Sequence, residues 1–267
     1  MNDSILNQKN KERWFIHSLE KGLACLRTFS RNQPILTLSE IAKANDMNLA
    51  TARRYLETLR ELGYVLRDQS SKAYQLTPKV LRLGSWVIES MDLRSRVVPY
   101  LRAMTREFDI TTGCAILEGS EIVYIERFRS NDVVNLDLTA GSRLPAYCTS
   151  LGKAILAFLD EETRRSFIDK MDLVPHTPRT TTDKAVLWEE LRLTAQRGYS
   201  ISDEELTVGM KAISVPIFNR NRLVEGSFGV SYPSHREVEE GLKEALIREL
   251  LVIAQKVSCP QLAPLQR

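Results

Sequence analysis

The chain has 267 residues, 43% of them hydrophobic and 27% charged, with a formal net charge of +3. This composition is that of an ordinary folded protein, which excludes a wholly disordered chain, and the length favours two domains. Residues 1–90 hold 14 Lys and Arg against 9 Asp and Glu, which leaves 23 against 25 in the rest. A basic N-terminal third followed by a nearly neutral remainder is typical of a protein whose N-terminal domain binds phosphate groups. Chance alone can also produce an excess of positive charge of this size.

The first predicted elements are a polar, flexible tail over residues 1–17 and a helix over 18–29 (SLEKGLACLRTF). The apolar side chains that predict the buried stripe of this helix are Leu19, Leu23, Leu26 and Phe29. Pro34 then interrupts the chain. A second, short helix is predicted after Thr37, because Thr37 and Glu40 have the spacing of a capping box.

A third helix is predicted from Asn48, a favourable N-cap residue, to Leu62, with Gly63 positioned to end it. Its inward stripe is predicted to be Leu49, Ala52, Leu56 and Leu59. Its outward face is predicted to be Ala50, Thr51, Arg53, Arg54 and Glu57. Two short helices that meet across a polar turn, the second starting with small and basic side chains, indicate a helix-turn-helix that enters a major groove.

Two short strands, 64–67 and 73–76, follow around the polar turn 68–72 and predict a wing. Residues 18–77 are therefore interpreted as a winged helix-turn-helix that binds double-stranded DNA; the alternative is a module for protein association. The residues predicted to contact the DNA are Thr37, Ser39, Asn48, Ala50, Thr51, Arg53, Arg54, Arg67 and Lys72.

The remainder predicts a linker helix and a second domain of the α+β class. The linker helix is predicted over 78–97, either to transmit a signal and pair in dimers or to serve as a simple connector. The second domain is predicted over 98–259, before a tail at 260–267. Its strands are predicted at 112–117, 122–128, 133–138, 211–218 and 224–232. Its helices are predicted at 100–108, 150–159, 161–170, 183–197 and 237–258.

The four cysteines (Cys25, Cys114, Cys148 and Cys259) are far apart and form no CxxC motif, so we expect no metal site and no cofactor. The polar N-terminus and the lack of 18 consecutive apolar residues predict neither a signal peptide nor a membrane span, and therefore a cytoplasmic protein. No GxSxG, HExxH or GxGxxG motif is present. The acidic runs 189–190 and 203–205 are interpreted as solvated charges, so we do not expect an enzyme.

Several long runs of the sequence closely resemble the IclR family of bacterial regulators. These runs are LTLSEIAKANDMNLATARRYLETLRELGYV (36–65), YQLTPKVLRLG (74–84), GSRLPAYCTSLGKAILA (141–157), GYSISDEELTVGMKAISVPIF (198–218) and FGVSYP (228–233). The resemblance implies a winged-helix domain joined by the linker helix to a GAF-like effector domain. It also implies a dimer, or a dimer of dimers, on an inverted-repeat operator. The tract LPAYCTSLGKAILA looks more like the branch that controls aromatic-acid breakdown through the β-ketoadipate pathway.

The effector pocket that the resemblance implies comprises Ser150, Leu151, Ser202, Asp203, Met210, Ala212, Gly229 and Ser231. Because Ser202 and Gly229 stand where some relatives carry an acidic residue and a serine, a relative's ligand, such as glyoxylate, is not transferred. Ser150 begins a predicted helix whose free amides suit a carboxylate, or else it is an ordinary N-cap. Arg143 is a candidate counter-charge or a surface residue, and Tyr147 a candidate aromatic wall or a core residue.

The sequence therefore predicts a ligand-responsive transcription regulator that senses a small carboxylate, such as a hydroxybenzoate or protocatechuate. One alternative is an IclR-type regulator of sugar-acid or short-chain organic-acid metabolism. Another is a constitutive DNA-binding protein that senses nothing. The expected partners are an operator, the effector and further copies of the chain, with RNA polymerase as a potential additional partner.

Overall fold

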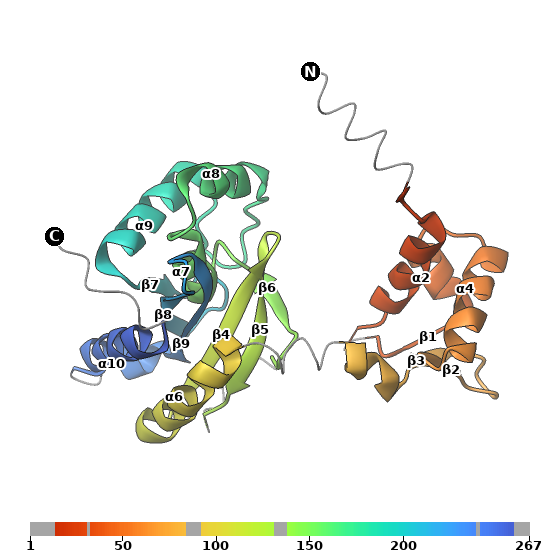
Figure 1. Cartoon of the computed structure of the whole chain (residues 1–267), viewed down its shortest axis with the longest axis horizontal. Helices are drawn as coiled ribbons and strands as arrows, with labels where there is room; N and C mark the ends of the chain where they lie inside the picture. The colour runs from red at the N-terminus through yellow and green to blue at the C-terminus, as the bar shows by residue number, and fades with distance from the viewer. Residues whose placement is uncertain (1–13, 31–32, 84–91, 131–137, 239–240, 259–267) are drawn as a thin grey trace, which may run out of the picture. The chain divides into compact units, whose positions relative to one another are not determined.

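The computed structural model describes residues 14–30, 33–83, 92–130, 138–238 and 241–258 (Figure 1). The chain divides into two compact units, residues 1–87 and 88–267, and each is described by itself. No helix in the described ranges is long and apolar enough to cross a membrane.

The N-terminal unit is a winged helix-turn-helix, as the sequence predicts. Its helices are α2 (His17–Arg27), α3 (Leu38–Ala44) and α4 (Leu49–Glu61), followed by the 3₁₀ turn η1 (Pro78–Val80). Its strands β1 (Ile35–Leu36), β2 (Val65–Arg67) and β3 (Tyr74–Leu76) form an antiparallel sheet in the order β1-β3-β2. The core packs Cys25 of α2, Ile41 of α3 and Leu56 of α4 against Tyr74 of the wing.

Local side chains fix the helix ends of this unit. Thr37 and Glu40 form the predicted capping box, and Asn48 accepts a hydrogen bond from the Thr51 amide at the start of α4. After α4, Gly63 has φ +76°, and the Gly63 and Tyr64 amides donate to the carbonyls of Arg60 and Leu59. This is the Schellman arrangement that glycine favours, because a Cβ is disfavoured at positive φ.

The predicted buried stripe of the first helix is correct at Leu26 and Phe29, which pack against the core, and wrong at Leu19 and Leu23. Leu19 and Leu23 are 61% and 41% exposed, whereas Cys25 is fully buried. Helix α2 faces α4 through Gly22 and Cys25, whose small side chains allow a close approach. Leu49, also predicted to be inward, is 53% exposed at the first turn of α4.

The C-terminal unit is a six-stranded antiparallel sheet with helices on both faces (Figure 1), which confirms the α+β class. The strand order is β6-β5-β4-β9-β8-β7. The strands are β4 (Thr111–Glu118), β5 (Glu121–Phe128), β6 (Arg143–Pro145), β7 (Ser200–Asp203), β8 (Met210–Phe218) and β9 (Val224–Pro233). The helices are α6 (Asp92–Phe108), α7 (Ser150–Leu156), α8 (Glu161–Lys170), α9 (Lys184–Arg197), the 3₁₀ turn η2 (Ser234–Val238) and α10 (Leu242–Val257).

The two faces of this sheet carry different side chains. The face under α6 and α10 is built from large apolar groups, among them Phe228, Val230 and Tyr232 of β9. Because side chains alternate along a strand, the face toward α7 takes the intervening positions, which in β9 are Ser227, Gly229 and Ser231. One face therefore forms the main core, and the other leaves space beneath α7.

Several predicted boundaries in this unit are wrong. Of the predicted linker helix at 78–97, residues 78–80 form the turn η1, 81–83 are helical, and 92–97 are the first turns of α6, while 84–91 lie outside the described residues. Helix α6 continues through Pro99, where the sequence predicts a break, because Leu93, Val97 and Leu101 pack along one side of it. The predicted helix 237–258 instead begins at Leu242, after Gly241 with φ +75°. Most of the predicted strand 133–138 lies outside the described residues.

Candidate functional site

Helix α4 presents a basic surface at its N-terminal half. Arg53 and Arg54 are exposed on this helix, and in the described part of the chain neither is paired with an acidic side chain. By contrast, Arg60 near the end of α4 is paired with Glu57 and Glu61. The positive charge available to a phosphate or a base edge is therefore at the start of the helix, beside exposed Ala50.

The other predicted DNA-contacting residues lie at the surface of the same unit, but their side chains differ in availability. Thr37 and Asn48 are engaged as helix caps, whereas Ser39 is exposed on α3. On the wing, the Arg67 guanidinium lies 5.6 Å from the Tyr74 ring centre, and Lys72 is exposed at the turn with φ +59°. Thr51, in the first turn of α4, is half-buried.

A cavity that opens to solvent lies between α7 and the sheet of the C-terminal unit, with about 560 Å³ of space when its open side is included. Its lining residues are Tyr124, Arg127, Leu138, Leu144, Cys148, Thr149, Ser150, Leu151, Ser202, Leu206, Thr207, Met210, Lys211, Ala212 and Ser231. A smaller space of about 240 Å³ shares part of this lining and reaches the sheet floor at Gly113, Ser214 and Gly229.

The structure brings together most of the predicted effector residues. Six of them line the larger cavity: Ser150, Leu151, Ser202, Met210, Ala212 and Ser231. Gly229 lines the smaller space. Asp203 lines neither; its carboxylate lies 2.6 Å from Arg179 and 3.1 Å from Lys211.

Arg143 and Tyr147 lie away from this lining. The Arg143 guanidinium is paired at the sheet edge with Glu118 and Glu121, at 2.6 and 2.7 Å. The Tyr147 hydroxyl donates to the Val174 carbonyl, and its ring is buried among core residues. The aromatic side chain in the cavity wall is instead Tyr124.

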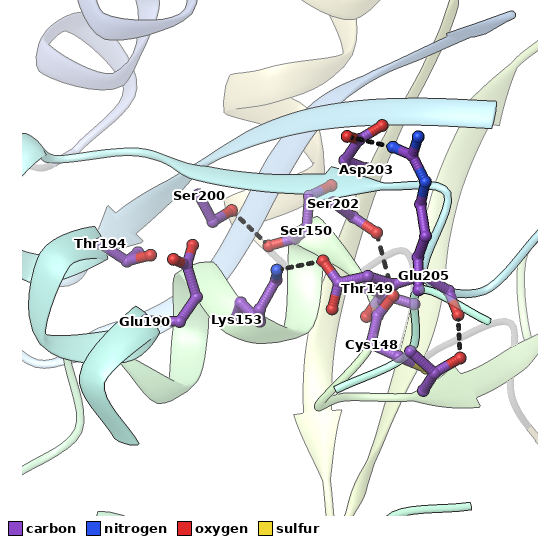
Figure 2. Close-up of polar contacts among 12 residues, drawn as sticks. Cys148, Thr149, Ser150, Lys153, Glu190, Thr194, Ser200, Ser202, Asp203 and Glu205 are labelled. Atoms are coloured by element: carbon purple, nitrogen blue, oxygen red, sulfur yellow. Dashed lines mark hydrogen bonds and ion pairs between the residues drawn. The ribbon is translucent and has the colours of Figure 1, made fainter. Parts of the chain in front are cut away.

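Ser150 is not the N-cap of α7, because Thr149 has that role and accepts a hydrogen bond from the Gly152 amide. The Ser150 hydroxyl is therefore available to the cavity, where its oxygen lies 2.7 Å from that of Ser214. The neighbouring hydroxyl groups satisfy backbone carbonyls (Figure 2): Ser200 donates to Ser150 and Ser202 to Cys148. These hydrogen bonds attach the start of α7 to β7 and β8.

A buried ion pair joins α7 to the segment that follows β7 (Figure 2). The Lys153 ammonium lies 2.5 Å from a Glu205 carboxylate oxygen, and the two residues are 2% and 8% exposed. Burial raises the pKa of Glu205 above its usual value, against the opposing effect of Lys153. Thr177 donates to the Glu204 carbonyl and Thr180 to the Glu205 carbonyl, so the backbone is also fixed just before Leu206 and Thr207 of the cavity wall.

Comparison with known proteins agrees with both units. The model of the IclR helix-turn-helix domain matches residues 18–69, and that of the bacterial transcriptional regulator IclR C-terminal domain matches 85–259. The chain belongs to the IclR family. It is therefore a transcription regulator with a DNA-binding and an effector-binding domain, and not an enzyme.

Individual IclR-family proteins are similar over most of the chain. The Pca regulon regulatory protein of Pseudomonas putida is 33% identical over 93% of this chain and 84% of its own. The p-hydroxybenzoate hydroxylase transcriptional activator of Acinetobacter baylyi is 34% identical over 78% of each chain. The crystal structure of a putative transcriptional regulator from Rhodococcus sp. RHA1 has a TM-score of 0.79 at 34% identity, covering 91% of this chain and 97% of that one.

Sequence reasoning missed the two cations that line the cavity of this IclR-family protein, Arg127 of β5 and Lys211 of β8. Lys211 lies 3.1 Å from Asp203, which holds its charge at the end of β7. Arg127 is half-buried and donates a long hydrogen bond of 3.4 Å to the Leu138 carbonyl. The available signal was a charged residue inside the strand run IVYIERF, but the bulge at Ile125 of β5 changes the alternation and hides which face Arg127 takes.

Proposed function

We propose that this IclR-family regulator binds an operator through α4 and the β2–β3 wing, and that a small aromatic carboxylate in the α7 cavity controls its binding. The observation that carries the ligand proposal is the lining of the cavity. Apolar side chains such as Tyr124, Leu144 and Met210 form much of its wall, and its other lining residues include three serines and two cations. Apolar walls with a few directed polar groups are what a flat, singly charged acid requires.

The names of similar proteins support the aromatic class. One relative is an activator of p-hydroxybenzoate hydroxylase, an enzyme that by its name acts on an aromatic acid. The other regulates the Pca regulon. A hydroxybenzoate or protocatechuate is therefore the effector that we propose, in preference to a sugar acid or a short-chain acid, whose many hydroxyl or water contacts the apolar walls would not satisfy.

The proposed assembly is a dimer, or a dimer of dimers, on an inverted repeat, so that two copies of α4 enter successive major grooves. An effector changes operator affinity only by the difference in its own affinity for the DNA-bound and free arrangements of that assembly. The coupling is reciprocal: an acid that weakens DNA binding is itself bound more weakly in the presence of DNA.

The test is operator binding by the full-length chain, with the promoter DNA that flanks its own gene. Binding is titrated with salt and with a panel of hydroxybenzoates, protocatechuate, sugar acids and short-chain acids. We expect specific binding that falls steeply with salt and shifts with an aromatic acid. A shift with sugar acids alone would contradict the aromatic class, specific binding that ignores every acid would indicate a constitutive DNA-binding protein, and no specific binding would contradict the operator assignment.

A further inference from the structure

The floor of the effector cavity is a row of small residues that runs across the sheet from one arginine. Arg127 of β5 is opposite Gly113 of β4, Gly113 is opposite Gly229 of β9, and Gly229 is opposite Ser214 of β8. Residues opposite each other in neighbouring strands share a face, so all four are on the α7 side. The row thus has a guanidinium at one end, a serine hydroxyl at the other, and no side chains between them.

The charge of Arg127 lacks the compensation that other arginines of this unit have. Arg94, Arg143 and Arg197 each lie within 2.7 Å of a carboxylate oxygen. Over the described ranges no carboxylate is paired with Arg127, whose hydrogen bond goes to the Leu138 carbonyl at 3.4 Å. Burial lowers the pKa of Arg127, and the like charge of Arg129 acts in the same direction. A half-buried guanidinium with one weak neutral acceptor is a site at which an anion is stabilised.

The spacing of the strands along this row suits a ligand with a single aromatic ring. Neighbouring strands lie about 4.8 Å apart, so the three steps from Arg127 to Ser214 span about 14 Å. Side chains rise from the sheet, so the two glycines between Arg127 and Ser214 leave room for one substituted ring above Gly229. The Tyr124 ring lies against Gly113, where an added Cβ would come within 2.8 Å of it, and so it borders this space on one side.

We infer that Arg127 is the residue that binds the effector's carboxylate, with the flat ring over Gly229 beside Tyr124 and the opposite end of the ring at the Ser150 and Ser214 hydroxyls. This inference rests on the proposed function and specifies the chemistry of that site. A guanidinium donates two parallel hydrogen bonds to a carboxylate, so Arg127 distinguishes an acid from an amide of the same shape. The paired serine hydroxyls suit a hydroxyl group at the para position, since each can donate or accept.

The experiment measures binding of 4-hydroxybenzoate and 4-hydroxybenzamide to the full-length chain by calorimetry, for the wild type and for Arg127→Gln, Arg127→Lys and Arg143→Gln. Arg143→Gln is the matched control, because Arg143 lies in the same sheet but pairs with surface glutamates. We expect the wild type and Arg143→Gln to prefer the acid equally. We expect Arg127→Gln to bind the acid about 10- to 100-fold more weakly and to lose the preference over the amide, and Arg127→Lys to recover part of it.

The melting temperature without ligand separates a binding role from a structural one. Because Arg127 has no carboxylate partner in the described structure, Arg127→Gln should melt at or above the wild-type temperature, and a clear decrease would overturn the inference. Equal acid binding by Arg127→Gln and the wild type would also overturn it, while leaving the proposed function intact. If the wild type binds a sugar acid and no aromatic acid, the aromatic proposal and the ring placement both fail, and Arg127→Gln with that sugar acid then tests the carboxylate contact alone.

Discussion

At the residue scale, the Lys153–Glu205 pair is the feature whose disruption should cost most. Lys153→Met leaves the Glu205 carboxylate buried without its cation, which typically costs about 3–5 kcal/mol. Urea unfolding of the full chain measures this loss. Adding Glu205→Leu to Lys153→Met should recover most of the stability, because two apolar side chains need no compensation.

The control for this pair is Arg192→Met, which removes an exposed ion pair with Glu189 on α9. Surface pairs of this kind contribute at most about 1 kcal/mol. A cost for Lys153→Met no larger than that of Arg192→Met would mean that Glu205 is rehydrated or protonated, and that the pair does not fix the cavity wall.

Gly229 lies at a position where the sheet leaves no room for a side chain. An added Cβ would lie 2.1 Å from the Ser214 hydroxyl oxygen and 2.2 Å from the Ile213 carbonyl oxygen, and the latter cannot move without breaking the sheet. Gly229→Ala should therefore lower the free energy of unfolding by about 1–3 kcal/mol. Gly22→Ala is the opposite case, with its nearest atom at 3.9 Å inside α2, and should raise stability by about 0.5–1 kcal/mol. Thermal unfolding distinguishes the two variants. An unchanged melting temperature for Gly229→Ala would contradict the close approach of β8 to β9 at this position.

At the scale of elements, α3 allows the stabilising effect of its N-cap to be compared with the effect of an exposed residue on the same helix. The Thr37 hydroxyl oxygen accepts a hydrogen bond from the Glu40 amide, and the Glu40 carboxylate accepts from the Thr37 amide and hydroxyl, so Thr37→Ala removes the side-chain half of the capping box and should cost about 1 kcal/mol. Ser39→Ala removes an exposed hydroxyl on the same helix and should leave the unfolding midpoint unchanged. Chemical denaturation measures both; equal midpoints for the two variants would mean that the capping box adds nothing to the folded unit.

Helix α4 allows a matched comparison of arginines on one element. Arg53→Ala or Arg54→Ala should weaken operator binding by about 1–3 kcal/mol for a lost base contact, or reduce the salt dependence if the contact is to phosphate. Arg60→Ala, whose guanidinium is held by Glu57 and Glu61, should change binding little. Fluorescence anisotropy at several salt concentrations measures the three variants. Full affinity in both Arg53→Ala and Arg54→Ala would contradict the assignment of α4 as the recognition helix.

Elements governed by local chemistry were predictable, and those governed by packing were not. The caps at Thr37 and Asn48 and the end of α4 at Gly63 follow from residues within one turn. The phase of α2 depends on which face meets α4, and apolar spacing alone favoured Leu19 over Cys25. Strands β6 and β7 were missed because they have three and four residues, and their pairing depends on distant neighbours.

The residues of the candidate site also fall into those that the sequence predicts and those that depend on the packing of the sheet. The small residues of β8 and β9 were assigned through resemblance, and the structure brings them to one cavity. The sequence favours Arg143 as a counter-charge because Arg143 is close in sequence to Ser150, and it gives no such reason to consider Arg127. Closeness in sequence says little across a sheet, where Arg127 reaches the floor by register with Gly113 while Arg143 turns to the edge.

At the scale of the whole molecule, the two units have separate cores and should respond separately to a ligand of one of them. A ligand at one hundred times its Kd stabilises the state that binds it by about 2.7 kcal/mol. Differential scanning calorimetry with 4-hydroxybenzoate should therefore raise one transition and leave the other unchanged. Gly229→Ala and Thr37→Ala identify which transition belongs to which unit, and a joint shift of both transitions would show that the units unfold as one.

The alternation along β9 has a consequence for how such a protein can change. Phe228, Val230 and Tyr232 hold the main core. On the other face, Gly229 and Ser231 line the space beneath α7, and Ser227 donates to the Leu151 carbonyl of α7. A one-residue insertion would exchange the two sets, putting phenylalanine and valine beneath α7 and glycine and serine into the core. A point substitution at Ser231 can therefore change the lining without touching the core, whereas the length of this strand is constrained by both faces.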